Sequence, residues 1–150
     1  MLFSTDFIED VYCEIVNMSK FEALPFNVKF KMEVTNYSQN VLIPSGSYCE
    51  SGHISSPPMA IIPGKTGEIM GHKMAFCATG ACGVVSWDVE GINSKLAVMY
   101  SCPYNFDLYS NWLAVGMFDV GVYTDKKLFQ RMYYDEGKYF INPLSANFLL

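Results

Sequence analysis

The sequence predicts a mainly β protein, an antiparallel β-sandwich flanked by two helices. Apolar and polar residues alternate strictly over 26–34, which is the period of a half-buried strand. Further short strand candidates follow at close intervals, with Gly, Pro and Asn residues between them, which is typical of a sandwich. These candidates are residues 41–43, 68–76, 83–87, 96–101 and 112–118. Residues 36–38 and 44–46 are expected to form turns.

The length of the chain is typical of one domain. A chain of 150 residues is long enough to bury a substantial core. No internal repeat, low-complexity segment or domain boundary is visible in the sequence. We therefore expect one domain over 1–150, in which an amphipathic N-terminal helix within 1–20 precedes a sandwich over 26–150.

The N-terminal segment 3–17 has the pattern of an amphipathic helix of about four turns. Acidic residues fall mostly on one face, and apolar residues recur at helical spacing on the other. The apolar positions are Phe3, Phe7, Ile8, Val11, Tyr12, Ile15 and Val16. Asp6 is expected to cap this helix, with Glu9 three residues later. The pattern alone also fits a helix that is docked on the core.

A second helix is expected from Thr124 to about Tyr133. Thr124 is a suitable N-cap residue, and Leu128, Phe129 and Met132 share one face at helical spacing. An apolar face of this kind is typical of a helix that packs against a core.

Net charge and hydropathy limit the partners of this chain. The formal net charge is −5, so the sequence has no electrostatic footprint for nucleic acid. An acidic chain is also repelled by strongly anionic lipid, so a membrane partner would present zwitterionic headgroups. The sequence has no uncharged apolar stretch of roughly 18 residues, the length that a transmembrane helix needs. Its first residues do not resemble a signal peptide.

Motifs for catalysis and metal binding are missing from the sequence. His53 and His72 have no nearby carboxylates or thiols at ligand spacing. The run 64–66 resembles the end of a phosphate-binding loop, but Met59 stands where that loop needs its first glycine. We therefore expect no enzyme, no metal site and no cofactor. The five cysteines are odd in number and form no Cys-x-x-Cys pair, so buried or inert thiols are expected.

Aromatic residues gather in the segment 96–134. A predicted strand opens into a loop rich in aromatic rings, and the second helix adds further rings. These residues are Tyr104, Phe106, Tyr109, Trp112, Phe129, Tyr133 and Tyr134. Such a cluster can fill a core, or it can form a partly exposed cage. An exposed cage would attract quaternary ammonium groups and settle at the headgroup level of a bilayer.

Three runs of the sequence resemble the actinoporins, the pore-forming toxins of sea anemones. Residues 96–112 read Leu-Ala-Val-Met-Tyr-Ser-Cys-Pro-Tyr-Asn-Phe-Asp-Leu-Tyr-Ser-Asn-Trp, which is similar to the central segment of that family. Residues 78–84 are similar to its Ala-Thr-Gly-rich strand, and residues 132–134 are similar to its paired tyrosines. The run Trp-Leu-Ala-Val-Gly at 112–116 is nearer to the actinoporin-like proteins of fishes.

The resemblance implies a sandwich that binds phosphocholine headgroups, with a preference for sphingomyelin. It also implies that the N-terminal helix enters the bilayer and joins helices of other copies to line a cation-conducting pore. The phosphocholine site is carried over to Ser51, Cys82, Ser101, Pro103, Tyr109, Phe129, Tyr133 and Tyr134. Membrane contacts are carried over to Tyr104, Leu108 and Trp112. The amphipathic segment at the N-terminus would supply the pore helix, with Phe3, Phe7, Ile8, Val11, Tyr12 and Ile15 on its apolar face.

Several positions depart from the family pattern. Cys82 stands for a valine, which changes little, and Phe129 stands for a tyrosine, which removes a hydroxyl. Leu108 stands for an exposed tryptophan, so one membrane anchor is weakened. Anemone toxins are typically basic and free of cysteine, and they carry an Arg-Gly-Asp triplet that is absent here. Residues 138–150 do not resemble the family's closing strands, so the sandwich is expected to lack its final strands.

The sequence therefore predicts a secreted, pore-forming cytolysin that acts on a target cell membrane and self-associates into a pore oligomer. The acidic polar face of the N-terminal helix would favour cations in that pore. An alternative function is a non-lytic module of the same fold that binds lipid headgroups or carbohydrates. Leu108 at the position of a tryptophan, together with the short C-terminal end, favours this alternative.

Overall fold

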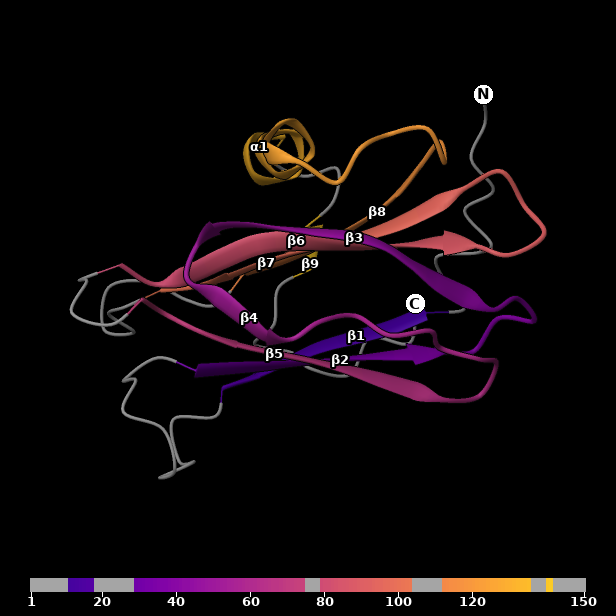
Figure 1. The fold of residues 1–150 in the computed structure, drawn as a ribbon, viewed down its shortest axis with the longest axis horizontal. Coiled ribbons are helices and arrows are strands. Elements are labelled where there is room, and N and C mark those ends of the chain that lie inside the picture. The colour runs from indigo at the N-terminus through magenta and orange to yellow at the C-terminus, as the bar shows by residue number, and fades with distance from the viewer. Residues whose placement is uncertain (1–10, 18–28, 75–78, 104–111, 136–139, 142–150) are drawn as a thin grey trace.

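The computed structural model describes residues 11–17, 29–74, 79–103, 112–135 and 140–141 (Figure 1). Within these residues the chain forms nine strands and one helix. The strands are β1 (Val11–Asn17), β2 (Lys29–Asn36), β3 (Leu42–Ser51), β4 (His53–Ser56), β5 (Thr66–His72), β6 (Ala81–Val89), β7 (Lys95–Cys102), β8 (Trp112–Phe118) and β9 (Phe140–Ile141). The helix α1 (Lys126–Tyr134) lies between β8 and β9 in the chain.

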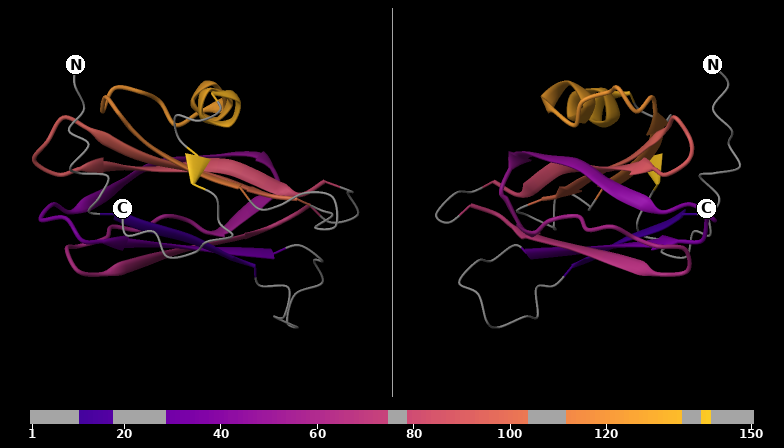
Figure 2. Two further views of the ribbon diagram at one scale, coloured as in Figure 1. Left: turned by 180° about the vertical axis from the view of Figure 1, so that it is seen from behind. Right: turned by 45° about the vertical axis from the view of Figure 1, so that its right-hand side comes forward.

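The strands form two antiparallel sheets that stack face to face. The four-stranded sheet has the order β1-β2-β5-β4, and the five-stranded sheet has the order β3-β6-β7-β8-β9. Figure 1 shows the sheets as two layers, with α1 on the outer face of the five-stranded sheet. The views in Figure 2 show the same three layers. The predicted antiparallel β-sandwich is therefore confirmed, with one flanking helix among the described residues.

The inner faces of the two sheets enclose the main hydrophobic core. β2 contributes Phe30, Met32 and Val34 to this core, following the alternation that the sequence predicts. The five-stranded sheet contributes large side chains that include Trp87 and Tyr100. The rings of Phe30 and Tyr100 meet between the sheets with their centroids 4.4 Å apart. This aromatic pair joins the two layers at the centre of the sandwich.

The outer face of the five-stranded sheet is covered by α1. Val84, Met99 and Ala114 come from the three central strands and form a second buried cluster with Leu128 and Met132 of the helix. Strands β6, β7 and β8 are therefore buried on both faces. This double burial explains why their sequences are almost continuously apolar.

Asp125 is the N-cap residue of α1, so the predicted cap at Thr124 is wrong by one position. The Asp125 carboxylate accepts a hydrogen bond from the backbone N–H of Leu128 at 3.0 Å, which satisfies an amide of the first turn. The Thr124 hydroxyl instead shares a hydrogen bond with the hydroxyl of Ser86 on β6. The predicted apolar face of the helix is confirmed, since all three of its residues are buried.

Residues Val11–Asn17 form the strand β1, so the helix predicted over 3–17 is wrong for this part of the segment. β1 pairs antiparallel with β2 from end to end, with Val11 opposite Asn36 and Asn17 opposite Phe30. The sequence VYCEIVN is rich in β-branched and aromatic residues, which favour strands. Backbone pairing with β2 therefore outweighs the helical spacing of the apolar residues.

Only three of the six predicted pore-helix positions lie in the described part of the chain. Val11, Tyr12 and Ile15 lie in β1, the edge strand of the four-stranded sheet. Phe3, Phe7 and Ile8 lie outside the described residues.

The strand β9 follows α1 and pairs with the first part of β8, with Leu113 opposite Ile141 and Ala114 opposite Phe140. The expectation that closing strands are missing after the helix is therefore wrong at these two residues. β9 pairs with a backbone edge of β8 that would otherwise be open. Residues 142–150 lie outside the described residues.

The strand β3 is longer than predicted and continues through the expected turn at 44–46. Its register with β6 shifts between Pro44 and Gly46 and again between Cys49 and Ser51. β3 is an edge strand, and an edge position with a bulge tolerates a proline, which cannot donate a backbone hydrogen bond. The short strand β4 has no counterpart among the predicted strands.

We expect the substitution Phe30→Ala to lower the free energy of unfolding by about 3–5 kcal/mol, because it empties a buried site between the sheets. Urea denaturation followed by circular dichroism measures this change. The matched control Tyr37→Ala removes an exposed ring and should change stability by less than about 0.5 kcal/mol. Equal losses in the two variants would contradict the central role of the Phe30 contact.

Candidate functional site

Four residues form a row across the five-stranded sheet. Ser51 on β3 is opposite Cys82 on β6, and Cys82 is opposite Ser101 on β7. Ser101 is in turn opposite Trp112, the first residue of β8. Side chains of directly opposed residues project from the same face of a sheet. Cys82 packs against the cluster that includes α1, so the row lies on the outer face, beside the helix.

Helix α1 places aromatic rings next to this row. The Tyr133 ring lies nearly parallel to that of Trp112, with 6.5 Å between centroids and 20° between planes. Tyr134 meets Tyr133 edge to face with 5.0 Å between ring centroids, and the Phe129 ring lies 5.4 Å from that of Tyr133. Rings in such arrangements attract one another beyond their buried area. The ring cluster is defined here as Trp112, Phe129, Tyr133 and Tyr134.

Exposure divides the ring cluster into a support and a rim. Phe129 is only 4% exposed, whereas Trp112 is 41% and Tyr134 is 71% exposed. Tyr133 is half-buried, and this burial raises the pKa of its hydroxyl, which stays protonated at neutral pH. The buried Phe129 therefore supports the Tyr133 ring, and Trp112 and Tyr134 form a rim whose rings are exposed to solvent.

The structure brings together most of the residues carried over for the phosphocholine site. Ser51, Cys82 and Ser101 lie in the row, and the three aromatic residues of α1 lie beside it. The Ser51 hydroxyl donates to the carbonyl of Gly80 at 2.9 Å. Pro103 is half-buried directly after β7. Tyr104, Leu108 and Tyr109 lie outside the described residues.

The sequence analysis missed two residues at the edge of this surface, Tyr48 and Glu50. The Tyr48 ring lies 6.2 Å from that of Phe129, and its hydroxyl donates to the Glu50 carboxylate. This hydrogen bond is the main cause that raises the pKa of Tyr48 to about 12. The period-2 spacing of Tyr48 and Glu50 would have indicated one face of a strand, had the turn predicted at 44–46 not ended that strand early.

Two of the free cysteines, Cys82 and Cys102, have thiols of raised pKa and low reactivity. Cys49, Cys82 and Cys102 are unpaired in the described part of the chain. Burial, and next the charge of Glu50, raise the pKa of Cys82 to about 11. Burial also raises the pKa of Cys102 to about 12. Since the thiolate is the nucleophile, these thiols behave as small apolar side chains at neutral pH.

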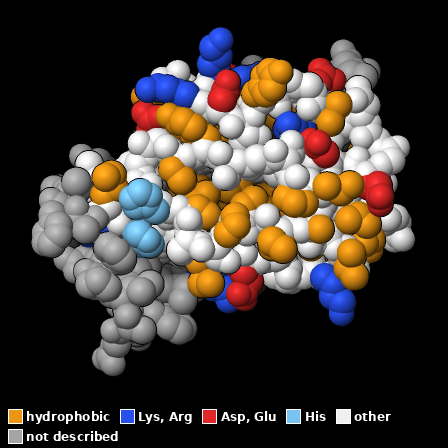
Figure 3. Space-filling model, viewed as in Figure 1, with side chains coloured by type: hydrophobic (Ala, Val, Ile, Leu, Met, Phe, Trp, Pro, Cys, Tyr) orange, Lys and Arg blue, Asp and Glu red, His pale blue; other side chains and the backbone are white. Residues whose placement is uncertain are grey.

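Two histidines lie on the other sheet, away from the ring cluster. His53 on β4 is opposite His72 on β5, and their ring centroids are 5.5 Å apart, as the pale blue pair in Figure 3 shows. Within the described ranges, no group of three or more His, Cys, Asp and Glu residues could hold a metal ion. No helix in that part of the structure is both long and apolar enough to cross a membrane.

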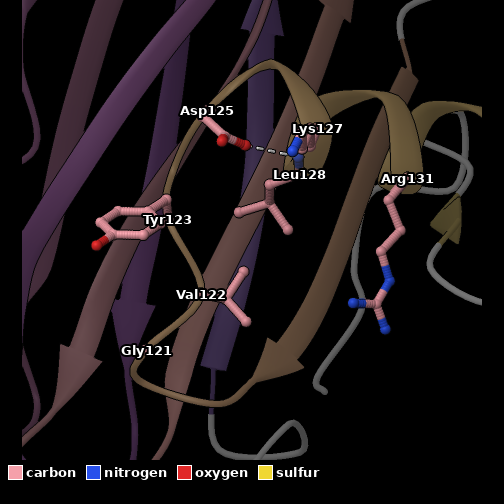
Figure 4. A pocket seen from close by; sticks show the side chains of 7 residues that line it. All are labelled: Gly121, Val122, Tyr123, Asp125, Lys127, Leu128 and Arg131. Atoms are coloured by element: carbon pink, nitrogen blue, oxygen red, sulfur yellow. Dashed lines mark hydrogen bonds between the residues drawn. The ribbon is translucent and has the colours of Figure 1, made fainter.

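A shallow cavity of about 250 Å³ lies where the connection from β8 enters α1 (Figure 4). Val122 and Leu128 form its apolar lining, and Tyr123 and Arg131 stand at its border. It lies near the start of the helix, whereas Tyr133 and Tyr134 lie at the end. The cavity is therefore separate from the ring cluster.

The sandwich fold is shared with a solved structure. The lipid-binding protein Nakanori superposes with a TM-score of 0.55 at 14% identity, over 65% of this chain and 50% of that one. At this identity the likeness concerns the fold alone.

The family of the chain is shown by its sequence. The family model described as sea anemone cytotoxic protein matches residues 17–144. The chain therefore belongs to this family, the actinoporins, as the resemblance predicts.

The curated relatives that it matches have names that contain the word toxin or end in -porin. Tereporin-Ca1 of Terebra anilis is 34% identical over 121 residues, which cover 78% of this chain and 64% of the relative. Echotoxin-2 of Monoplex parthenopeus is also 34% identical, over 73% of this chain and 41% of the relative. Hydra actinoporin-like toxin 6 of Hydra vulgaris is 38% identical, over 60% and 47%. The chain thus spans less than two thirds of the length of these relatives.

We expect the Cys82 thiol of the folded protein to react with iodoacetamide at pH 8 about a hundredfold more slowly than an unshifted thiol. A pKa raised from 9.0 to about 11 leaves about a hundredth of the thiolate. Mass spectrometry of the labelled peptide over time measures the rate, with the urea-unfolded chain as the control. Equal rates in the folded and unfolded chain would contradict the burial of this thiol.

Proposed function

We propose that the chain binds phosphocholine headgroups at the ring cluster and the neighbouring row. The observation that carries this proposal is the partly exposed stack of Trp112 on Tyr133, with Tyr134 at its edge. Aromatic faces attract quaternary ammonium groups through their ring quadrupoles. Trp112 and Tyr134 also suit the interface of a bilayer, where an apolar ring body and a polar tip are both accommodated.

The proposal also assigns roles to the remaining residues of the site. The Ser51 and Ser101 hydroxyls would lie near the phosphate, with Cys82 between them as a neutral, apolar contact. Pro103 borders the row, and Phe129 supports the rings. Tyr109, predicted from the family resemblance, belongs to the same proposal, as do the membrane contacts Tyr104 and Leu108.

We further propose that the protein is a secreted cytolysin that self-associates in a target membrane and opens a pore. The family assignment supports this activity, since the family is described as sea anemone cytotoxic protein and its relatives include Tereporin-Ca1 and Echotoxin-2. Sphingomyelin, which carries the same phosphocholine headgroup, is the expected preferred lipid. Conduction of cations, which is expected from the acidic residues of the N-terminal segment, belongs to the same proposal. The proposal includes no catalytic step.

The pairing of β1 limits how the N-terminal segment could take part in a pore. Val11–Asn17 are joined to β2 along the full length of the strand. Insertion of this segment would therefore first require its separation from β2, which would leave an open sheet edge behind. A helix preformed over these residues is not part of the proposal.

A second candidate function is a non-lytic module that binds lipid headgroups or carbohydrates. The solved structure with the same fold is described as a lipid-binding protein. This candidate uses the same ring cluster but needs neither self-association nor release of β1. Binding to vesicles without leakage would favour it, and competition by simple sugars would identify a carbohydrate ligand.

We expect the purified chain to bind phosphatidylcholine vesicles and to release a trapped dye when sphingomyelin is included. Sedimentation with vesicles measures binding, and fluorescence dequenching measures release. Absence of release, with a folded chain confirmed by circular dichroism, would contradict the pore function and leave the second candidate.

The substitutions Trp112→Ala and Tyr133→Ala should each weaken vesicle binding by about tenfold, because each removes an aromatic face worth about 1–2 kcal/mol to a cationic headgroup. Tyr123→Ala is the matched control, since that ring is 82% exposed but lies outside the ring cluster. An equal loss in the control would contradict a specific site at Trp112 and Tyr133.

A further inference from the structure

Glu50 is the acidic residue that the structure places at the edge of the ring cluster. One of its carboxylate oxygens accepts the hydrogen bond from the Tyr48 hydroxyl. The other lies 3.6 Å from the ammonium group of Lys126, the first residue of α1. The Tyr48 ring in turn contacts Phe129. The Glu50 carboxylate is thus linked to Phe129 through Tyr48, first by a hydrogen bond and then by a contact between rings.

The charge of Glu50 acts on the row itself. It contributes to the raised pKa of Cys82, the central residue of the row, which indicates that its field reaches the space above these strands. The contact with Lys126 neutralises this field only in part, because 3.6 Å is long for an ion pair and the Lys126 side chain is 58% exposed. A negative charge fixed beside aromatic faces adds to their attraction for a cation.

We propose that Glu50 is a specificity-determining residue of the ring cluster, which favours headgroups that present a quaternary ammonium over headgroups whose net charge is negative. This inference rests on the proposed headgroup site and deepens it. Tyr48 is the positioning residue, since its hydroxyl holds the carboxylate at the edge of the rings. The ammonium group of Lys126 competes with the ammonium group of a bound headgroup for the Glu50 carboxylate.

The test compares the partition of the purified chain between phosphatidylcholine vesicles and phosphatidylglycerol vesicles at low salt. Glu50→Gln keeps the shape of the side chain and should lower the ratio of the two partition constants by about three- to tenfold. Lys126→Gln should raise the ratio, because it removes the competitor. Tyr48→Phe should lower the ratio less than Glu50→Gln does. It keeps the charge of Glu50 but removes the hydrogen bond that positions the carboxylate.

The matched control for net charge is Glu90→Gln. Glu90 is exposed in the turn after β6, at the opposite end of that strand from Cys82. The substitution Glu90→Gln changes the total charge by the same amount as Glu50→Gln, and it should leave the ratio of the partition constants near that of the unmodified chain. Competition by tetramethylammonium chloride, which carries the cationic half of the headgroup alone, should weaken in Glu50→Gln and stay unchanged in Glu90→Gln.

Three results would overturn the inference. If Glu50→Gln and Glu90→Gln change the ratio equally, the effect comes from total charge and Glu50 has no special role. If Lys126→Gln lowers the ratio, the lysine and not the glutamate contacts the headgroup. If the unmodified chain does not bind phosphatidylcholine, the proposed function fails and the inference fails with it. The first two results leave the headgroup site intact as long as Tyr133→Ala still loses binding.

Discussion

The burial of β6, β7 and β8 on both faces is the constraint on which the rest of the structure depends. Tyr100 of β7 points inward and contacts Phe30 of the other sheet, whereas its neighbour Met99 belongs to the cluster beneath α1. Because successive side chains point to opposite faces, a slip of one residue would exchange these two sets. The register of the central strands is therefore fixed from both sides. The same register aligns Cys82 with Ser101 and Ser101 with Trp112.

The close approach of the strands depends on glycines that face the inner aromatic pair. A Cβ added at Gly83 of β6 would lie 2.7 Å from the Tyr100 hydroxyl and would also overlap the backbone of β3 at Tyr48. A Cβ at Gly71 of β5 would overlap the ring of Phe30. These two positions therefore allow the inner rings to fill the core at full size. The approach at Gly83 also brings β3 against β6, which carries Tyr48 to the edge of the ring cluster.

The outer surface combines parts that have different physical roles. Phe129 supplies a buried support, and Trp112 and Tyr134 supply exposed faces. Glu50 supplies a negative charge, which its contact with Lys126 on α1 offsets only in part. A surface of this kind attracts a cationic group without a deep pocket, since both the ring quadrupoles and the carboxylate act at its rim. The proposed preference for zwitterionic over anionic bilayers rests on this surface together with the net charge of −5.

The sequence by itself determined the β-sandwich, the helix with its buried face, and the family to which the site residues belong. These features depend on local periodicity, as in β2, or on the long run at 96–112, which identifies the family without a structure. Its likeness to fish proteins stays a prediction. The tertiary structure decided the rest. Val11–Asn17 satisfy helical spacing, but β2 offers them a partner edge and makes them a strand.

Contacts between distant segments account for the other differences. Asp125 caps α1, and the hydroxyl of Thr124 bonds to Ser86 instead. Glu50 lies at the edge of the ring cluster because β3 continues past Pro44 through a bulge. Sequence spacing records which residues share a face within one element. It does not record which element supplies the opposite partner, because that choice is made by packing between segments far apart in the chain.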